Sequence, residues 1–142
     1  LIETINTIRE AVIMAKLATI TGTPVVVSFV CDREGKLLSG ETLTNAASQL
    51  LPLGISAIGV NCGPTPNLAK PLAELQAVCG KDFPLIAYGN IGYADEKVGW
   101  VNTDSENPEA YYEHASHWPA KIIGGCCGTT PEHISKLRSA IA

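Results

Sequence analysis

The chain has 142 residues, of which 46% are hydrophobic and 17% are charged, and its formal net charge is −4. This composition is typical of a globular domain with one core of moderate size, and the negative charge argues against a nucleic-acid-binding surface. No apolar run reaches the ~18 residues of a membrane-spanning helix, and Glu3 and Arg9 lie where a signal peptide would have its basic start and apolar block.

Strand-like and helical patterns alternate along the chain. The strands are short apolar runs, predicted at 1–5, 23–30, 55–62, 83–90 and 120–127. Helical patterns are predicted after them, at 6–22, 42–53, 68–79, 108–118 and from 131 onward. Gly80 ends the third helix, and Thr130 followed by Pro131 begins the last one. The polar segment 91–108 is predicted to be a long loop.

The alternation of strands and helices predicts a parallel sheet with helical crossovers. The strands are apolar throughout, which is typical of a sheet covered on both faces. Two architectures fit: consecutive units of a (β/α)8 TIM barrel, or a five-stranded doubly wound parallel sheet. A complete barrel takes roughly 250 residues, so the first architecture makes this chain an incomplete barrel, roughly strands 4–8. The chain also starts with Leu1 inside an apolar run, so we expect a piece of a longer polypeptide.

Side chains with useful chemistry lie at or near the end of every predicted strand. In chain order they are Glu3, Ser28, Asn61 with Cys62, Tyr88 with Asn90, and Cys126 with Cys127. In parallel α/β folds the active site lies at the carboxyl ends of the strands. We therefore expect these residues to converge in space.

Two adjacent cysteines, Cys126 and Cys127, lie among glycines in the segment GGCCGTTPEH. Neighbouring side chains on a regular strand point to opposite faces, so both sulfurs can face one point only where the strand bends. The flanking glycines permit such a bend. With Cys62, three thiolates can then surround one ion, which predicts zinc. Cys31 and Cys79 are poorly placed for a fourth ligand, and three ligands with an open position are the pattern of catalytic zinc.

Other interpretations of the same residues remain open. The zinc site can belong to a non-catalytic module that the metal only stabilises, or Cys126 and Cys127 can form the redox-active pair of a dithiol protein. Glu3 inside an apolar strand favours a functional role, because a buried carboxylate is costly unless it is paired. Asn61 and Ser28 are weaker candidates, because such groups at strand ends commonly hydrogen-bond loop backbone. Five cysteines without a disulfide framework predict a reducing, cytoplasmic location.

Three motifs resemble the homocysteine S-methyltransferase family: GVNC at 59–62, YGN at 88–90 and GGCCGTTPEHI at 124–134. LIETI, PVVVSF and LLSGE are also similar to its middle segments, so the resemblance covers essentially the whole chain. It implies that residues 1–142 are the C-terminal part of a single homocysteine-binding (β/α)8 barrel. The implied activity is zinc-dependent methyl transfer to homocysteine, giving methionine. The donor would be S-methylmethionine, betaine, or methylcobalamin or folate bound by other domains, with no nucleic-acid or membrane partner.

Carried over by position, the resemblance implies that zinc is held by Cys62, Cys126 and Cys127. Glu3 matches the carboxylate that binds the homocysteine ammonium, and Asn90 matches an asparagine near the metal. Asn61 and Ser28 complete the candidate substrate-binding residues, and no catalytic residue beyond the metal site is implied.

Gly89 departs from the family pattern, because many members have proline at this position. The family's N-terminal segment that helps to bind the amino acid has no counterpart in this chain. We therefore expect the isolated 142 residues to be inactive.

Overall fold

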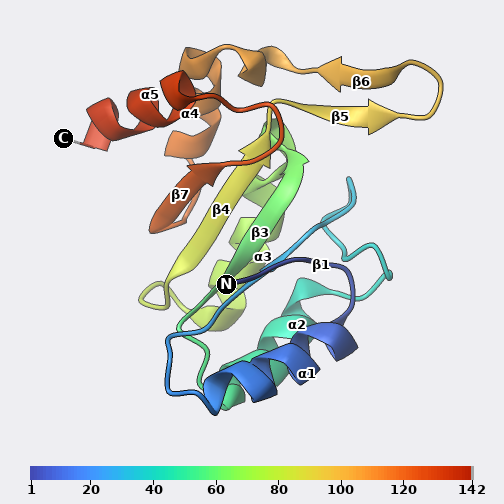
Figure 1. Cartoon of the computed structure of the whole chain (residues 1–142), viewed down its shortest axis with the longest axis vertical. Helices are drawn as coiled ribbons and strands as arrows, with labels where there is room; N and C mark the ends of the chain where they lie inside the picture. Colours follow the sequence, from blue (N-terminus) through green and yellow to red (C-terminus); the bar gives the residue numbers. More distant parts are fainter. Residues whose placement is uncertain (142) are drawn as a thin grey trace.

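The computed structural model describes residues 1–141 and confirms the alternation of strands and helices (Figure 1). The main sheet contains β1 Ile2–Ile5, β2 Val26–Phe29, β3 Ala57–Pro64, β4 Leu85–Asn90 and β7 Ile122–Gly125. The α-helices are α1 Ile8–Thr19, α2 Leu43–Leu50, α3 Ala69–Cys79, α4 Pro108–Ser116 and α5 Pro131–Ile141. Three 3-10 turns are η1 Leu51–Leu53, η2 Thr65–Asn67 and η3 Asp104–Glu106. Within residues 1–141, none of these helices has the length and hydropathy needed to cross a bilayer.

The five strands are parallel, and their order in the sheet, β1-β2-β3-β4-β7, is their order along the chain. A doubly wound sheet reverses its strand order at a switch point. The doubly wound alternative is therefore wrong, and the sheet is a run of consecutive barrel-type β/α units. Among the described residues, β1 and β7 each pair with one neighbouring strand.

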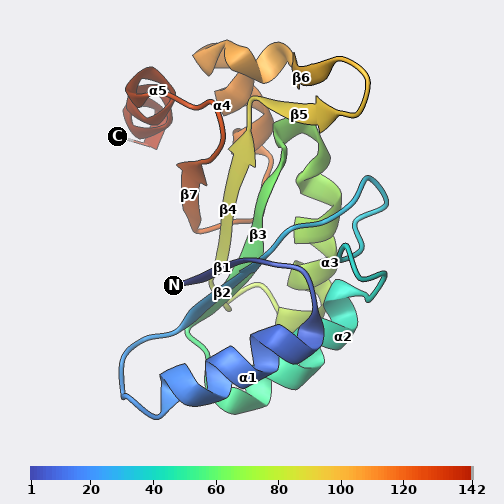
Figure 2. The ribbon, with the colours of Figure 1, turned by 45° about the vertical axis from the view of Figure 1, so that its right-hand side comes forward.

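One face of the sheet packs against the helices and forms the core. Figures 1 and 2 show α1, α2 and α3 along the same side of the strands. The strand residues beneath them are almost fully buried: Val27, Phe29, Ile58, Val60, Leu85 and Ala87. Gly59 lies in register with Ile86, and a Cβ on Gly59 would come within 1.7 Å of the Ile86 carbonyl oxygen. The close packing of β3 against β4 therefore requires glycine there.

Residues 91–108 do not form the long loop that the sequence predicts. β5 Gly92–Asp95 pairs with β6 Gly99–Asn102 in an antiparallel hairpin, which is followed by η3. The hairpin turn is closed by the Asp95 side chain, whose Oδ1 accepts hydrogen bonds from the backbone of Lys97 and Val98. Gly99 has a φ of +78°, which glycine adopts without strain. The polar composition of this segment is typical of a loop, so the short, solvent-exposed hairpin was not predicted.

Side chains cap the helices at the positions where backbone N–H groups lack partners. Thr7, Thr42 and Asn107 accept hydrogen bonds from the first turns of α1, α2 and α4. At the start of α5, His133 accepts a hydrogen bond at Nδ1 from the backbone nitrogen of Thr130, at 3.1 Å. This contact takes the place of the reciprocal bond of a capping box, in which glutamate usually serves. It fixes the direction in which the chain leaves the two adjacent cysteines.

Candidate metal centre

The sulfur atoms of Cys62, Cys126 and Cys127 converge, as the sequence predicts. All three lie within 4.8 Å of one another, with Cys62 Sγ 3.8 Å and Cys126 Sγ 4.0 Å from Cys127 Sγ. A tetrahedral zinc shell with Zn–S bonds of ~2.3 Å places neighbouring sulfurs ~3.8 Å apart. The three side chains therefore fit three corners of such a shell, and soft sulfur donors suit zinc chemically.

The backbone at Cys62 leaves the regular strand so that its sulfur can reach this point. Cys62 has a φ of +60°, which is uncommon for a residue with a Cβ, and the register of β3 against β4 shifts between Asn61 and Pro64. Strained backbone of this kind persists where the surrounding structure fixes it, and it is frequent at functional sites.

The two adjacent cysteines lie in a tight turn that follows β7. Cys126 donates its N–H to the Gly89 carbonyl, and its own carbonyl accepts hydrogen bonds from the backbone and hydroxyl of Thr129. Gly128 has a φ of +80°, and a Cβ there would lie 2.5 Å from the Ile91 side chain. The predicted role of glycine in bending the chain is therefore explained at Gly128 by both conformation and space.

The electrostatics of the metal-free cluster favour the protonated thiols of Cys62 and Cys126. Burial raises the pKa of the Cys62 thiol, and the nearby Cys126 thiol raises it further. Burial likewise raises the pKa of the Cys126 thiol. Because metal ligation requires thiolates, binding of an ion here would release protons.

Asn90 lies beside the cluster at the end of β4 and is almost completely buried. Its Nδ2 donates a hydrogen bond to the Cys62 carbonyl at 2.8 Å, and its Oδ1 accepts one from the Cys127 N–H at 3.0 Å. The amide thus joins the backbones of two cysteines that lie far apart in sequence.

Glu3 is exposed, so the expected cost of burying its carboxylate does not arise. The reason is that β1 is an edge strand of the described sheet and its Glu3 position is open to solvent. One carboxylate oxygen accepts a hydrogen bond from the Tyr88 hydroxyl at 2.8 Å. Burial and this hydrogen bond raise the pKa of Tyr88, so its hydroxyl remains a donor. Glu3 is thereby held at the rim of the sheet by a residue of β4.

Asn61 and Ser28 are buried and bind protein groups. Asn61 Oδ1 accepts hydrogen bonds from the Thr4 N–H at 3.0 Å and from the Ser28 hydroxyl at 2.7 Å, and its Nδ2 donates to the Thr4 hydroxyl. Thr4 has a φ of +59°, so this network holds a strained β-branched residue next to Glu3. Asn61 thus binds the backbone of strand β1 and two side chains, rather than the loop backbone expected from the sequence.

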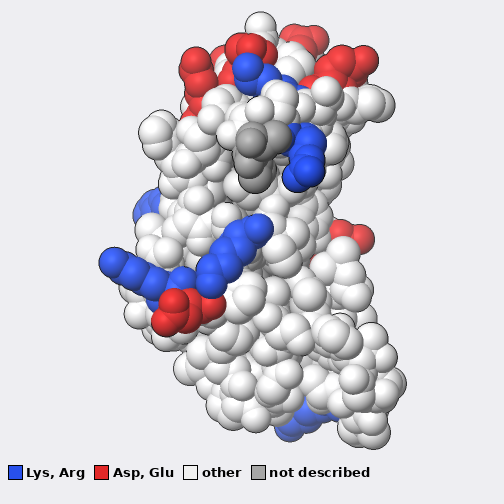
Figure 3. Space-filling model, turned by 90° about the vertical axis from the view of Figure 1, so that its left-hand side faces the viewer, with Lys and Arg blue, Asp and Glu red and all other residues white. Residues whose placement is uncertain are grey.

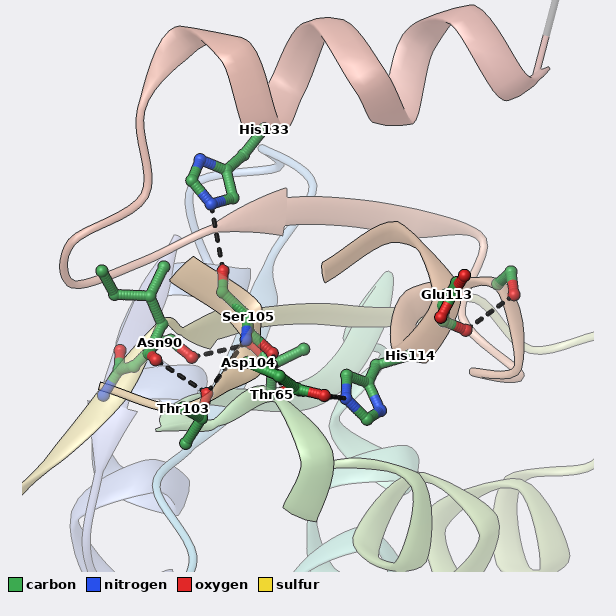
Figure 4. Close-up of polar contacts among 10 residues, drawn as sticks. Thr65, Asn90, Thr103, Asp104, Ser105, Glu113, His114 and His133 are labelled. Carbon is green, nitrogen blue, oxygen red and sulfur yellow. Dashed lines mark hydrogen bonds and ion pairs between the residues drawn. The ribbon is translucent and has the colours of Figure 1, made fainter. Parts of the chain in front are cut away.

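A second layer of hydrogen bonds supports the ends of β4 and β7. Thr65 donates to the Asn90 carbonyl at 2.7 Å, and Thr103 donates to the Ile91 carbonyl at 2.7 Å (Figure 4). His133 reaches from α5 to the Ser105 carbonyl at 3.1 Å. Tyr111 packs edge-on against His133. Thr65, Thr103 and Tyr111 lie in no motif, so the sequence does not indicate them. His133 lies within the motif GGCCGTTPEHI at 124–134.

The other two cysteines lie outside the three-sulfur cluster. Cys31 and Cys79 are partly buried and pack against the hydrophobic core. Burial raises the pKa of both thiols, to about 12 for Cys31. Both serve as packing residues in this structure.

Comparisons with known proteins agree with this geometry. The family model described as homocysteine S-methyltransferase matches residues 1–141. The chain is 28% identical over 123 residues to a methionine synthase of Mycobacterium leprae (strain TN), a match that covers 84% of this chain and 10% of that protein. Among solved structures, it is similar to the apo form of the homocysteine methyltransferase MmuM from Escherichia coli (TM-score 0.76, 25% identity, 96% of this chain, 48% of that one). The metallated form of MmuM gives a TM-score of 0.76 at 26% identity, with 97% of this chain and 43% of that one covered. The chain thus spans about a tenth of the methionine synthase and less than half of MmuM.

Proposed function

Because the chain belongs to the homocysteine S-methyltransferase family, we propose that it takes part in zinc-dependent transfer of a methyl group to the thiol of homocysteine, giving methionine. The observation that carries the proposal is the convergence of the Cys62, Cys126 and Cys127 sulfurs within 4.8 Å of one another. The two separations from Cys127 Sγ, 3.8 and 4.0 Å, are close to that between neighbouring corners of a tetrahedral zinc shell. A site with three protein ligands keeps one position for a substrate, as catalytic zinc sites do.

The charge of the proposed site suits a nucleophilic thiol. When bound, zinc would supply a position at which the homocysteine thiol is held as a thiolate near neutral pH. The thiolates of Cys62, Cys126 and Cys127 carry three negative charges against the two positive charges of the ion, so the site has a net charge of −1. The substrate sulfur therefore stays electron-rich enough to attack.

Glu3, oriented by Tyr88, would bind the other end of homocysteine. The exposed Glu3 carboxylate is available to a substrate ammonium at the strand ends. The Tyr88 hydroxyl bonds one of its oxygens and restricts its orientation. The reacting thiol and the amino group would then be recognised by different strands, which orients the substrate before reaction.

In the proposed reaction the homocysteine sulfur attacks the methyl carbon of the donor. A new S–C bond forms, and the bond between the methyl group and the donor breaks with its electron pair leaving on the donor. The thiol proton has already been released to solvent. The proposed donors are S-methylmethionine, betaine, or methylcobalamin or folate bound by other domains. The proposed setting is the cytoplasm.

We also propose that residues 1–142 form the C-terminal part of a single homocysteine-binding (β/α)8 barrel. Three observations support this: the strands lie in chain order, β1 and β7 are the two edges of the described sheet, and the chain covers less than half of MmuM. On the side of the molecule where β7 and α5 lie, a small group of basic and acidic side chains crosses the middle, and uncharged surface lies around it (Figure 3). There Ile122 of β7 is 45% exposed, and a cleft of about 630 Å³ lies against β7, α4 and α5. These features suit further β/α units packing against β7.

Two alternatives from other classes make different predictions. A dithiol redox protein using Cys126 and Cys127 would be purified without metal and would reduce disulfide substrates in its metal-free form. A non-catalytic zinc module would bind the ion without responding to homocysteine. The sulfur of Cys62 in the cluster favours the metal site over the redox pair, because a dithiol needs only two sulfurs.

The function can be tested on the complete polypeptide that contains residues 1–142. We expect homocysteine to increase the thiolate-to-metal charge-transfer absorbance of the Co²⁺-loaded protein, because it adds a sulfur ligand. The zinc-loaded protein should form methionine from homocysteine with one of the proposed donors, and the chelator-treated protein should not. The proposed function would be rejected if homocysteine did not change the Co²⁺ spectrum and no donor gave methionine.

A further inference from the structure

The side chain of Asn90 forms hydrogen bonds with the backbones of two cysteines of the cluster. It is buried at the end of β4, between the segment that carries Cys62 and the turn that carries Cys127. Its Nδ2 donates to the Cys62 carbonyl at 2.8 Å and its Oδ1 accepts from the Cys127 N–H at 3.0 Å. Both polar atoms are therefore engaged with backbone rather than with a sulfur.

The two backbone groups that Asn90 binds lie where regular strand pairing ends. Cys62 has a φ of +60° and lies in the irregular part of the β3–β4 register. Cys127 lies in the turn after β7, two residues after Gly125, the last residue of that strand paired with β4. At both places a side-chain amide replaces ladder hydrogen bonds that the bent backbone cannot make.

The end of β4 holds the cysteine turn at three successive residues. The Gly89 carbonyl accepts from Cys126 N–H, the Asn90 side chain accepts from Cys127 N–H, and the Ile91 N–H donates to the Cys127 carbonyl. Asn90 is the member of this set that also reaches Cys62. Thr65 in turn fixes the backbone of Asn90 through its carbonyl.

We propose that Asn90 is a positioning residue whose amide sets the separation between the Cys62 and Cys127 sulfurs, and thereby the affinity and geometry of the metal site. The inference rests on the proposed metal site and deepens it. Supporting groups of this kind typically change metal affinity by about 10- to 100-fold when they are removed.

The test compares the Zn²⁺ affinity and the Co²⁺ charge-transfer spectrum of the wild-type protein with those of Asn90→Ala and Asn90→Asp. Asn90→Ala removes both hydrogen bonds and should weaken zinc binding by about 10- to 100-fold. Asn90→Asp keeps an acceptor for Cys127 but points an oxygen at the Cys62 carbonyl, so it should also lose affinity. The matched control is Asn102→Asp on the exposed β6, where Oδ1 accepts from Trp100 Nε1 and a carboxylate can do the same. This control should keep wild-type affinity.

The outcomes separate this inference from the proposed function. If the wild-type protein binds neither Co²⁺ nor Zn²⁺, the metal site itself is wrong. If the wild-type protein binds metal and both Asn90 variants bind it equally well, the positioning role is wrong and the metal site stands. If Asn90→Asp binds metal more tightly than wild type, residue 90 acts as a direct ligand and the inference is overturned.

A second variant keeps the test decisive if Asn90→Ala does not fold. Thr65→Val removes the hydrogen bond to the Asn90 carbonyl while leaving the amide in place. We expect a smaller but measurable loss of zinc affinity and a weaker charge-transfer band per bound Co²⁺. Wild-type values for Thr65→Val in a folded protein would contradict the proposal.

Discussion

The backbone nitrogen of Gly89 donates a hydrogen bond to the hydroxyl oxygen of Tyr111 at 3.0 Å. The same hydroxyl donates to the Gly124 carbonyl at 2.7 Å, so one buried side chain of α4 joins the ends of β4 and β7. Burial raises the pKa of Tyr111 to about 12, which keeps the hydroxyl protonated and able to donate. This junction lies one residue before Asn90 and two residues before Cys126, so it supports both sides of the candidate metal centre.

Replacing Gly89 with proline, the residue common in the family, should destabilise this protein. A Cβ at position 89 would lie 2.5 Å from Thr65 Oγ1, and proline has no N–H to donate to Tyr111. Overpacking and a lost buried hydrogen bond together suggest a loss of about 2–4 kcal/mol in the free energy of unfolding. Chemical denaturation measures it.

The matched control for this substitution is Gly124→Ala, in the neighbouring strand. A Cβ there would meet only the Tyr88 Cβ at 3.5 Å, an ordinary contact distance. We expect its cost to stay below about 1 kcal/mol. Equal stability of Gly89→Pro and wild type would show that the Gly89–Tyr111 contact is unimportant.

Tyr111→Phe should separate the contribution of the Tyr111 hydroxyl to the free energy of unfolding from the contribution of its ring. The ring still fills the core, but the Gly89 N–H and the Gly124 carbonyl lose their partner. Unpaired buried backbone groups suggest a loss of about 1–3 kcal/mol in unfolding free energy. Tyr112→Phe, at a half-buried position on the same helix, is the control and should change stability little. The junction would be refuted by equal denaturation midpoints for Tyr111→Phe and wild type.

Ionisation of the Glu41 carboxylate should make the free energy of unfolding depend on pH. The Ser39 hydroxyl and the Ile8 N–H at the start of α1 donate to its carboxylate and lower the pKa of Glu41. A carboxylate with a lowered folded-state pKa stabilises the protein above its unfolded pKa of ~4.3, and this stabilisation is lost as pH falls through the lower folded value.

Glu41→Gln tests this linkage, because it keeps an acceptor oxygen and removes the charge. The stability difference between wild type and Glu41→Gln should be constant from about pH 7 to pH 5 and shrink below the unfolded pKa of ~4.3. Thermal unfolding midpoints across this range measure the effect, and Glu96→Gln in the exposed hairpin turn is the control for net charge. A difference that stays unchanged down to pH 2 would contradict the assignment.

Removing the Glu3 carboxylate should weaken homocysteine binding without removing the metal. Glu3→Gln loses the charge that would pair with the substrate ammonium, and Tyr88→Phe loses the hydroxyl that orients it. We expect Glu3→Gln to raise the homocysteine concentration needed for the Co²⁺ spectral change by about 10-fold or more, as for a charged hydrogen bond of ~1.5–3 kcal/mol. Tyr88→Phe should have a smaller effect. The role of Glu3 would be rejected if Glu3→Gln titrated like wild type.

Much of the fold follows from local patterns in the sequence. The apolar runs before Asn61, Asn90 and Cys126 are regular strands, and the parallel order brings their ends to one edge of the sheet. The convergence of three sulfurs was predictable because it requires only strand order and a bend permitted by glycine. The alternation of strands and helices along the sequence could not distinguish the barrel-type sheet from the doubly wound one, since both folds alternate strand and helix in the same way.

Other features depend on contacts that no local pattern encodes. Whether Glu3 is buried depends on what lies beside the edge strand β1, not on the apolar residues around it. The bonds from Asn90 to Cys62 and Cys127 depend on the exact bend of two segments that are distant in sequence. The hairpin formed by β5 and β6 was missed because its alternation is short and its turn is charged.

Metal stoichiometry tests the central claim most directly. Protein purified under reducing conditions should contain about one zinc ion per chain, and Cys62→Ser and Cys127→Ser should each lose it, because three thiolates form one site. Cys79→Ser, which lies at the end of α3 outside the cluster, should retain the full amount. Retention of zinc by Cys62→Ser, or absence of zinc from the wild-type protein, would contradict a three-thiolate metal centre.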